Sequence, residues 1–527
     1  FRYASGFEGK DYPARCVFSP SYFDSDPTVL DARLCRASIC LALSAFGSNE
    51  ADPAKNIISF LSSVGCKKID VNPDYRLAPH PRTIGLALGQ RRLGFRTTLF
   101  VLGVRGSNYQ GEWGGNFLLG PSGPHQGFDL AAEKAFAFLK SRALKRSGKR
   151  VLWISGYSRA GAVANLTAAK AIDSGLFDAV CCYCFEAPAG AERSVAKDKK
   201  YRSIHNILDA SDLVPLTAPS SFGFARYGTD HFMPDPMFLT EMPSEAKSIW
   251  KTLADCSGRE YRFKAKKVTI GSLIGRLKDI PEDESNKDLP RSLFLRMMVP
   301  AFVSRAGTRE QYVKEMQPGL VALGTLIGGL GNPYKNMIAL LQSILTRALE
   351  ENAKLSLLAR GLRRSEKLEA SLIPIIEQEI GARKWPLDKG ALAKSLASVA
   401  YIMLDIALHE PWLVATMFDE ENVNAILAAH SPTRVYAEVN AISSYEDEPC
   451  FSVIRFDNAS LEIKDSSGKP VWPISGRPAA YRSGKKEIAL ALPRGDYEAS
   501  LAKGKAKLVL DEAEQEIRAT PYRFTVR

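Results

Sequence analysis

Two patterns of hydrophobic and polar positions alternate between about residues 95 and 216. Short runs that are apolar at nearly every position are separated by longer stretches with the 3.6-residue spacing of an amphipathic helix. Strands that are apolar throughout are typical of a parallel sheet buried on both faces. The pattern therefore predicts an α/β fold. We expect strands at 97–104, 150–154, 180–185, 204–208 and within 222–232, and helices at 128–144 and 160–172.

The pattern changes twice along the rest of the chain. From about 245 to 425 helical periodicity dominates, and after about 450 short alternating segments are separated by turn residues, which is typical of a small all-β unit. Upstream of the sheet, helices are expected at 31–46 and 56–64. The predicted parts are an α/β core at 1–245, a large helical insertion or cap at 246–425, a return to the core at 426–445 and a small C-terminal β-rich domain at 450–527.

Composition narrows the class of protein. The chain has 527 residues, of which 45% are apolar and 24% charged, as in a soluble globular protein, and no apolar run is long enough for a transmembrane helix. The net charge of +12 comes without a recognisable nucleic-acid-binding module, so no nucleic-acid partner is expected. The first residues lack the apolar region of a signal peptide, which leaves the compartment unknown: cytoplasmic, or secreted after removal of a signal peptide.

A sharp turn is predicted where the strand at 150–154 meets the helix at 160–172. The sequence of this turn is Gly156-Tyr157-Ser158-Arg159-Ala160-Gly161. A serine hydroxyl becomes a nucleophile when a base removes its proton, and a strand–serine–helix turn flanked by small residues exposes its oxygen above the sheet. We therefore predict that Ser158 is the nucleophile of a serine hydrolase. The N–H of Arg159 would be one oxyanion donor.

Four motifs occur in a fixed order around this turn. They are Val104-Arg105-Gly106-Ser107 with Glu112-Trp113 and Asn116-Phe117, then His125-Gln126-Gly127-Phe128, the Ser158 turn, and Asn206-Ile207 with Ser211-Asp212-Leu213-Val214-Pro215. Together they resemble the class-three (fungal triglyceride lipase-like) lipase family of the α/β-hydrolase superfamily, particularly its bacterial branch. The resemblance covers about residues 30–235 and a short segment near 430. It implies that Ser107 is the second oxyanion donor and that His125 is structural.

The acid and the base are expected to follow the nucleophile in the order acid, then base. Asp212 follows a predicted strand, and its Asp-x-Val-Pro context favours it over Asp209. His231, His409 and His430 all lie downstream. His430 is favoured because Ala429-His430-Ser431-Pro432 resembles the His-Ser-Pro of the bacterial branch, and His231 is kept as the alternative.

These residues predict a carboxylic ester hydrolase, lipase- or esterase-like, that acts on lipid or other acyl esters through an acyl-enzyme. Phospholipase, thioesterase or acyltransferase chemistry on the same residues is an alternative, as is a non-catalytic binding module. The mechanism needs neither a metal nor another cofactor. The expected partner is the ester or lipid substrate, and basic outer faces of the cap would suit contact with a membrane surface.

Overall fold

The fold was obtained as a computed structural model. It describes residues 2–5, 10–46, 52–75, 83–106, 112–210, 212–233, 298–299, 302–303, 305–327, 333–351, 366–382, 389–409, 429–441, 451–456, 461–472, 480–483, 487–493, 495–501, 506–510, 513–517 and 521–526. Among these residues, no helix is both long and apolar enough to cross a bilayer.

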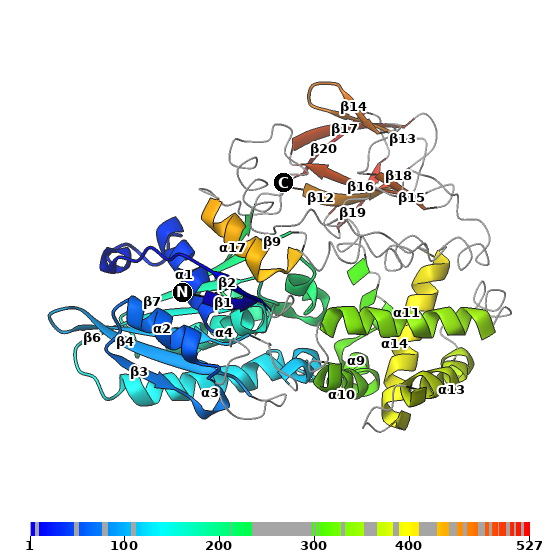
Figure 1. The fold of residues 1–527 in the computed structure, drawn as a ribbon. Coiled ribbons are helices and arrows are strands. Elements are labelled where there is room, and N and C mark those ends of the chain that lie inside the picture. Colours follow the sequence, from blue (N-terminus) through cyan, green and yellow to red (C-terminus); the bar gives the residue numbers. More distant parts are fainter. Residues whose placement is uncertain are drawn as a thin grey trace.

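A seven-stranded sheet with the order β11-β9-β7-β6-β5-β4-β3 forms the centre of the first half of the chain (Figure 1). Its strands are β3 (Lys68–Val71), β4 (Leu86–Gly94), β5 (Thr97–Val104), β6 (Lys149–Tyr157), β7 (Ala179–Phe185), β9 (Ile204–Asp209) and β11 (Thr229–Met233). The strands from β5 to β11 pair in parallel, whereas β3 and β4 pair antiparallel at one edge. The prediction of an α/β fold with a mainly parallel central sheet is therefore confirmed.

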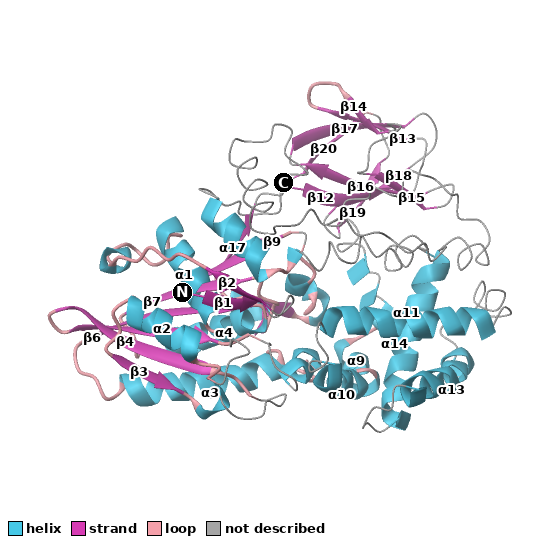
Figure 2. Ribbon diagram, in the orientation of Figure 1, coloured by secondary structure: helices cyan, strands magenta, loops and turns pink. Residues whose placement is uncertain are grey.

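Helices cover both faces of this sheet (Figure 2). The helices α3 (Gln126–Ala143) and α4 (Arg159–Asp173) share a core with one face, and α1 (Ala32–Ser44), α2 (Lys55–Ser63) and α17 (Pro432–Ala441) share a core with the other. Successive side chains of a strand point to opposite faces, so Phe100 packs on the α3 side and Val101 on the α1 side. This burial on both faces explains why the strands are apolar almost throughout.

The described helices between the sheet and α17 pack around a third core. They are α9 (Arg309–Glu315), α10 (Gln317–Ile327), α11 (Pro333–Glu351), α13 (Glu366–Ala382) and α14 (Lys389–His409). Polar contacts fix α9 and α10 to the loop before α3. The Arg309 guanidinium donates to carbonyl oxygens of that loop, including Gly120 O at 2.7 Å, and the side-chain oxygen of Gln317 accepts from Leu119 N at 2.7 Å.

The last strands form two antiparallel sheets with the orders β15-β16-β12-β18-β19 and β14-β13-β17-β20. The strands are β12 (Phe451–Phe456), β13 (Leu461–Asp465), β14 (Pro470–Trp472), β15 (Ala480–Ser483), β16 (Glu487–Pro493), β17 (Gly495–Leu501), β18 (Ala506–Leu510), β19 (Ala513–Ile517) and β20 (Tyr522–Val526). Side chains from both sheets, such as Leu508 and Ile463, share one hydrophobic core, so the two sheets face each other.

The structure differs from the sequence expectation in several elements. The antiparallel strands β3 and β4 were not expected, because β4 changes midway from buried positions to the alternating exposure of its Arg-Arg-Leu-Gly end and carries no continuous apolar run. Shorter described elements are β1 (Arg2–Ser5), β2 (Lys10–Pro13), β8 (Ala191–Glu192), α5 (Arg193–Ala196), β10 (Phe224–Ala225) and the 3-10 helices η1 (Pro20–Phe23), η2 (Pro73–Tyr75), η3 (Glu112–Phe117), η4 (Lys199–Tyr201), η5 (Val214–Leu216) and η6 (Ser220–Phe222).

Candidate active site

Ser158 occupies the turn between β6 and α4 with an uncommon backbone conformation. Its φ is 59° and its ψ is −130°, a region that is costly for any residue other than glycine. The chain can turn this sharply because its neighbours are small: a Cβ on Gly156 would lie 2.2 Å from the carbonyl oxygen of Ala160. The strained serine lies at the carboxyl end of a central parallel strand, where ligands bind in open α/β sheets.

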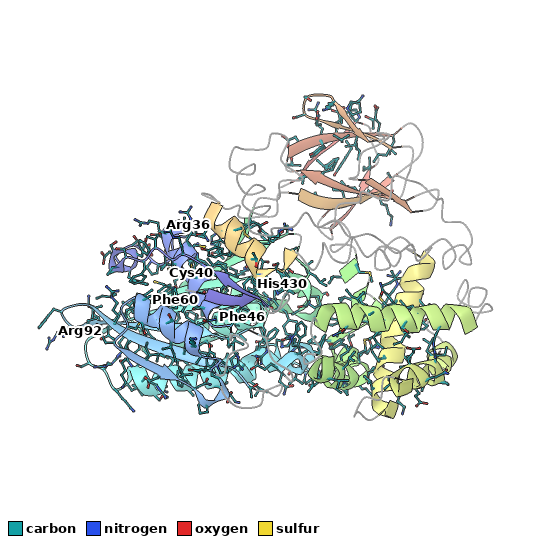
Figure 3. All side chains as sticks on the ribbon, in the orientation of Figure 1. Arg36, Cys40, Phe46, Phe60, Arg92 and His430 are labelled. Atoms are coloured by element: carbon teal, nitrogen blue, oxygen red, sulfur yellow. The ribbon has the colours of Figure 1, made fainter. Side chains whose placement is uncertain are left out.

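His430 lies just before α17 and joins the two other predicted residues by hydrogen bonds. Its Nε2 is 2.9 Å from Ser158 Oγ, and its Nδ1 is 2.5 Å from Asp212 Oδ2. The hydroxyl of Tyr157 donates to the backbone oxygen of His430 at 3.1 Å, which helps to hold the segment against the turn. Figure 3 shows His430 beside the α/β sheet, far from Arg92 at the distant end of β4.

Asp212, the predicted acid, is buried, and the backbone holds its carboxylate in place. The carboxylate of Asp212 is 1% exposed and accepts from Val214 N at 2.8 Å, in the turn that leads into η5. Asp209, the alternative acid, ends β9 and forms an ion pair with Arg434 of α17 at 3.0 Å. The structure therefore brings Asp212 to His430, whereas Asp209 binds α17, the helix that follows His430.

The alternative bases have other surroundings. His231 lies on β11, and its Nε2 is 3.0 Å from Nδ1 of His205, whose Nε2 donates to the backbone oxygen of Pro27 at 2.9 Å. Burial lowers the pKa of His205 to about 4, so His205 is neutral and its Nδ1 accepts a hydrogen bond from Nε2–H of His231. His409 ends α14, and its side chain lies outside the described residues.

Arg159 and Ser107 are the two predicted oxyanion donors. Arg159 is the first residue of α4, so its N–H points out of the positive end of the helix next to Ser158. Ser107 lies outside the described residues. The residue before it, Gly106, is so close to the turn that a Cβ there would lie 3.3 Å from the backbone oxygen of Tyr157.

A buried charge cluster beneath this region was not predicted from the sequence. Arg105 and Glu112 form an ion pair at 2.5 Å with side chains that are 1% and 0% exposed. The hydroxyl of Thr83 donates to the same Glu112 oxygen, and Thr83 O accepts from the buried guanidinium of Arg159. Burial lowers the pKa of Arg159. The only sequence signal was indirect, since Arg105 and Glu112 both belong to the motif around Ser107.

His125, for which the resemblance implied a structural role, is buried beside Phe128. Its ring stacks on Phe128 at 3.7 Å, and its Nε2 lies 3.2 Å from the backbone oxygen of Asn116. Burial lowers the pKa of His125 to about 3, so the ring is neutral and donates this hydrogen bond. The neighbouring Gly127 is required by space, because a Cβ there would lie 2.0 Å from the backbone oxygen of Gly115.

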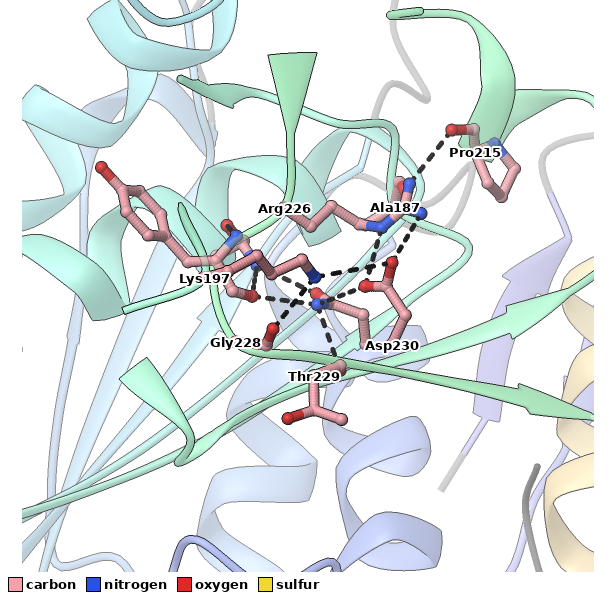
Figure 4. Close-up of polar contacts among 10 residues, drawn as sticks. Ala187, Lys197, Pro215, Arg226, Gly228, Thr229 and Asp230 are labelled. Atoms are coloured by element: carbon pink, nitrogen blue, oxygen red, sulfur yellow. Dashed lines mark hydrogen bonds and ion pairs between the residues drawn. The ribbon is translucent and has the colours of Figure 1, made fainter. Parts of the chain in front are cut away.

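Arg226 fastens the loop that carries Asp212 (Figure 4). Its Nη1 donates to Pro215 O at 3.0 Å and to Ala187 O at 3.2 Å, while its Nε and Nη2 both bind the Asp230 carboxylate at 3.1 Å. One guanidinium thereby joins the acid loop, the turn after β7 and the start of β11. Local sequence patterns do not reveal this role, because two of the three partner groups are backbone oxygens from distant segments.

An apolar cavity of 270 Å³ lies between the sheet's loops and the helices that follow. One wall comes from loops of the α/β half of the chain: Phe117 and Leu119 before α3, and Leu216 and Phe222 after Asp212. The other wall comes from helices and includes Leu323 of α10 and Leu396 of α14. Such a lining can hold an aliphatic chain but offers little to a charged group.

No family model matches this sequence, and no curated protein matches it. Solved structures with similarity include a triacylglycerol lipase whose catalytic centre is described as a serine protease triad (15% identity, TM-score 0.31, 42% of this chain and 84% of that chain). Others are the Rhizomucor miehei lipase propeptide complex (16%, 0.29, 42% and 71%) and the Lip2 lipase from Yarrowia lipolytica (16%, 0.26, 42% and 82%).

Proposed function

We propose that the protein is a serine hydrolase of the α/β-hydrolase fold that cleaves carboxylic esters of lipids or other acyl groups. Ser158 is the nucleophile, His430 the base and Asp212 the acid. The observation that carries this proposal is the chain of hydrogen bonds that joins the side chains of Ser158, His430 and Asp212. The strained backbone of Ser158 supports the same assignment, because nucleophile turns of this fold have such a conformation.

The proposed ester hydrolysis begins with His430 carrying its proton on Nδ1. Nδ1–H of His430 donates to Asp212, so Nε2 can accept the proton of the Ser158 hydroxyl as Oγ attacks the ester carbonyl. Negative charge develops on the carbonyl oxygen and is stabilised by the N–H of Arg159 and, as we propose, by Ser107. His430 then protonates the departing alcohol, leaving the acyl group on Ser158. A water that gives its proton to His430 hydrolyses this acyl-enzyme and restores the serine.

The apolar cavity supports an acyl group as the recognised part of the substrate. Leu216 is in η5, directly after the Asp212 loop, and Leu323 is on α10, which packs against η3. We propose that the helical segment (246–425) is a cap over the core (1–245). Residues 426–445 would return the chain to the core with the base, and residues 450–527 would form a separate β-rich domain. Contact of the cap with a membrane surface belongs to this proposal.

The motifs around Ser107, His125, Ser158 and Asp212, together with this geometry, support a relationship to the class-three lipases and their bacterial branch.

Fluorophosphonate labelling tests the hydrolase assignment directly. We expect the wild type and Ser141→Ala, a change at an exposed serine of α3, to label, and Ser158→Ala not to label. If the folded wild type does not label, the protein is a binding module. p-Nitrophenyl esters of graded chain length, assayed beside phospholipid and thioester substrates, then identify the bond that is cleaved.

A further inference from the structure

A glutamate that the proposed mechanism does not use lies directly behind the acid. Glu186 follows β7, is 0% exposed, and has a φ of 46°, in the left-handed region that glutamate rarely adopts. Its N–H donates to Ile207 O at 3.0 Å, which keeps the residue in line with the neighbouring strand β9. An acidic side chain in a strained and fully buried position requires specific partners to hold it there.

Those partners are two other acids. Both carboxyl oxygens of Glu186 lie 3.0 Å from the backbone N of Asp209, at the start of the turn in which Asp212 N donates to Asp209 O. This places Glu186 against the Asp212 carboxyl group: after burial, the charge of Asp212 is the largest cause that raises the pKa of Glu186, and a side-chain hydrogen bond with Asp212 also contributes. A hydrogen bond between two carboxyl groups contains a proton, because two buried carboxylates in contact would repel each other. One of these two residues is therefore protonated when the other is ionised.

The surroundings decide which residue holds the proton. The Asp212 carboxylate accepts from His430 Nδ1 with one oxygen and from Val214 N with the other. Burial raises the pKa of Glu186 well above its usual value, and the charges of Asp212 and Asp209 raise it further. The nearby cation, Arg434, is engaged by Asp209 and by Glu438 of its own helix. Among the described residues, the charged or titratable groups around Glu186 are Asp209, Asp212, His430, Arg434 and Glu438. Arg226, which donates to Ala187 O beside Glu186, is paired with Asp230.

We propose that Glu186 is a positioning residue whose carboxyl group stays protonated at neutral pH and donates a hydrogen bond to the Asp212 carboxylate. This inference rests on the proposed function for its effect on catalysis. The bond holds Asp212 in the rotamer that meets His430, and it withdraws part of the negative charge that would otherwise make the imidazole more basic. It also gives a physical reason for a glutamate at a position that would suit glycine better.

Glutamine and alanine at position 186 separate this role from simple packing. In Glu186→Gln, the amide NH₂ can donate to Asp212 and the amide oxygen can accept from Asp209 N. We therefore expect kcat within about threefold of wild type and an unchanged pKa for the acidic limb of the kcat/KM profile. In Glu186→Ala, Asp212 loses a donor, so kcat should fall at least about tenfold and the pKa of the acidic limb should rise.

A stability measurement tests the protonation without any activity. Glu186 would ionise in the unfolded chain near its ordinary pKa but stays protonated in the folded protein, so wild-type stability is lost as pH rises above about 4.5. Glu186→Gln cannot ionise. Its melting temperature relative to wild type should therefore increase steadily from pH 5 to pH 8. Glu310→Gln, at an exposed glutamate of α9, is the matched control and should show no such trend.

The outcomes are distinguishable. A stability difference between Glu186→Gln and wild type that does not grow with pH overturns the proposal, as does a glutamine variant whose acidic limb shifts like that of the alanine variant. If the pH-dependent stability difference is present but the wild type neither labels nor hydrolyses esters, the protonated Glu186 is supported and the proposed function fails.

Discussion

Nε2 of His430 lies 2.9 Å from the hydroxyl oxygen of Ser158, although the two residues are 272 positions apart in the sequence. The contact depends on α17, which begins two residues after the histidine. Val435 and Val439 of this helix are buried in the core shared with α1, and Arg434 pairs with Asp209 at the end of β9. A long excursion of the chain thus ends on a helix whose packing sets the position of one imidazole.

Replacement of the histidine should identify the base. We expect His430→Ala to lower kcat at least about 10³-fold, because His430 is the residue of the proposed triad that accepts the serine proton. His231→Ala should change kcat by less than about threefold, since its ring bonds to His205 rather than to Ser158. Steady-state kinetics on a p-nitrophenyl ester, with circular dichroism to verify folding, measure both. A large loss in His231→Ala with little loss in His430→Ala would reverse the assignment.

The fastening role of Arg226 predicts an effect on catalysis from outside the reacting groups. Arg226→Lys keeps the charge but cannot bind Asp230, Pro215 O and Ala187 O at the same time. The loop with Asp212 should become less well fixed, and kcat/KM should fall about tenfold together with a lower melting temperature. Arg193→Lys, at an exposed arginine of α5, is the control. Equal kinetics for the two variants would mean that the loop is held by other contacts.

The apolar cavity predicts selectivity for acyl chain length. In Leu323→Trp a larger ring would occupy the space that we assign to the chain, so hydrolysis of long-chain esters should fall at least about tenfold relative to acetate esters. Leu144→Trp, at a leucine that is 60% exposed after α3, should leave the chain-length profile unchanged. An unchanged ratio in Leu323→Trp would show that the acyl chain binds elsewhere.

The buried His125 predicts a loss of stability in acid. Its pKa is about 3 in the folded protein, because burial disfavours the charged ring, and near 6.5 when unfolded. The unfolded state therefore binds more protons below pH 6.5, and the free energy of unfolding falls on acidification by up to about 1.4 kcal/mol per pH unit. His125→Gln should show a shallower decline between pH 6.5 and 4.5 in urea titrations. Parallel curves for the two proteins would contradict this.

Local sequence patterns determined much of the core. The apolar runs and helical spacings between residues 95 and 216 predicted the parallel part of the sheet, because burial on both faces requires such runs. The turn at Ser158 was also visible locally, since its small neighbours are dictated by contacts only four residues apart, as between Gly156 and Ala160. Motif and chain order made Asp212 and His430 the favoured acid and base. The sequence holds no distances, so it could not exclude their competitors Asp209, His231 and His409.

Only the tertiary structure decided which side chains meet. The antiparallel strand β4, the cluster of Arg105, Glu112 and Arg159, and the bridge from Arg226 all depend on segments that are distant in the sequence. Glu186 is the clearest case: in the sequence it is one acid after an apolar strand, and in the fold its carboxyl group accepts from the backbone N of Asp209, in the turn that carries Asp212. A residue's type and local spacing favour one secondary structure and set what chemistry its side chain can perform. Its pKa and its partners depend on burial and on which remote groups pack against it, and those are set only when the chain has folded.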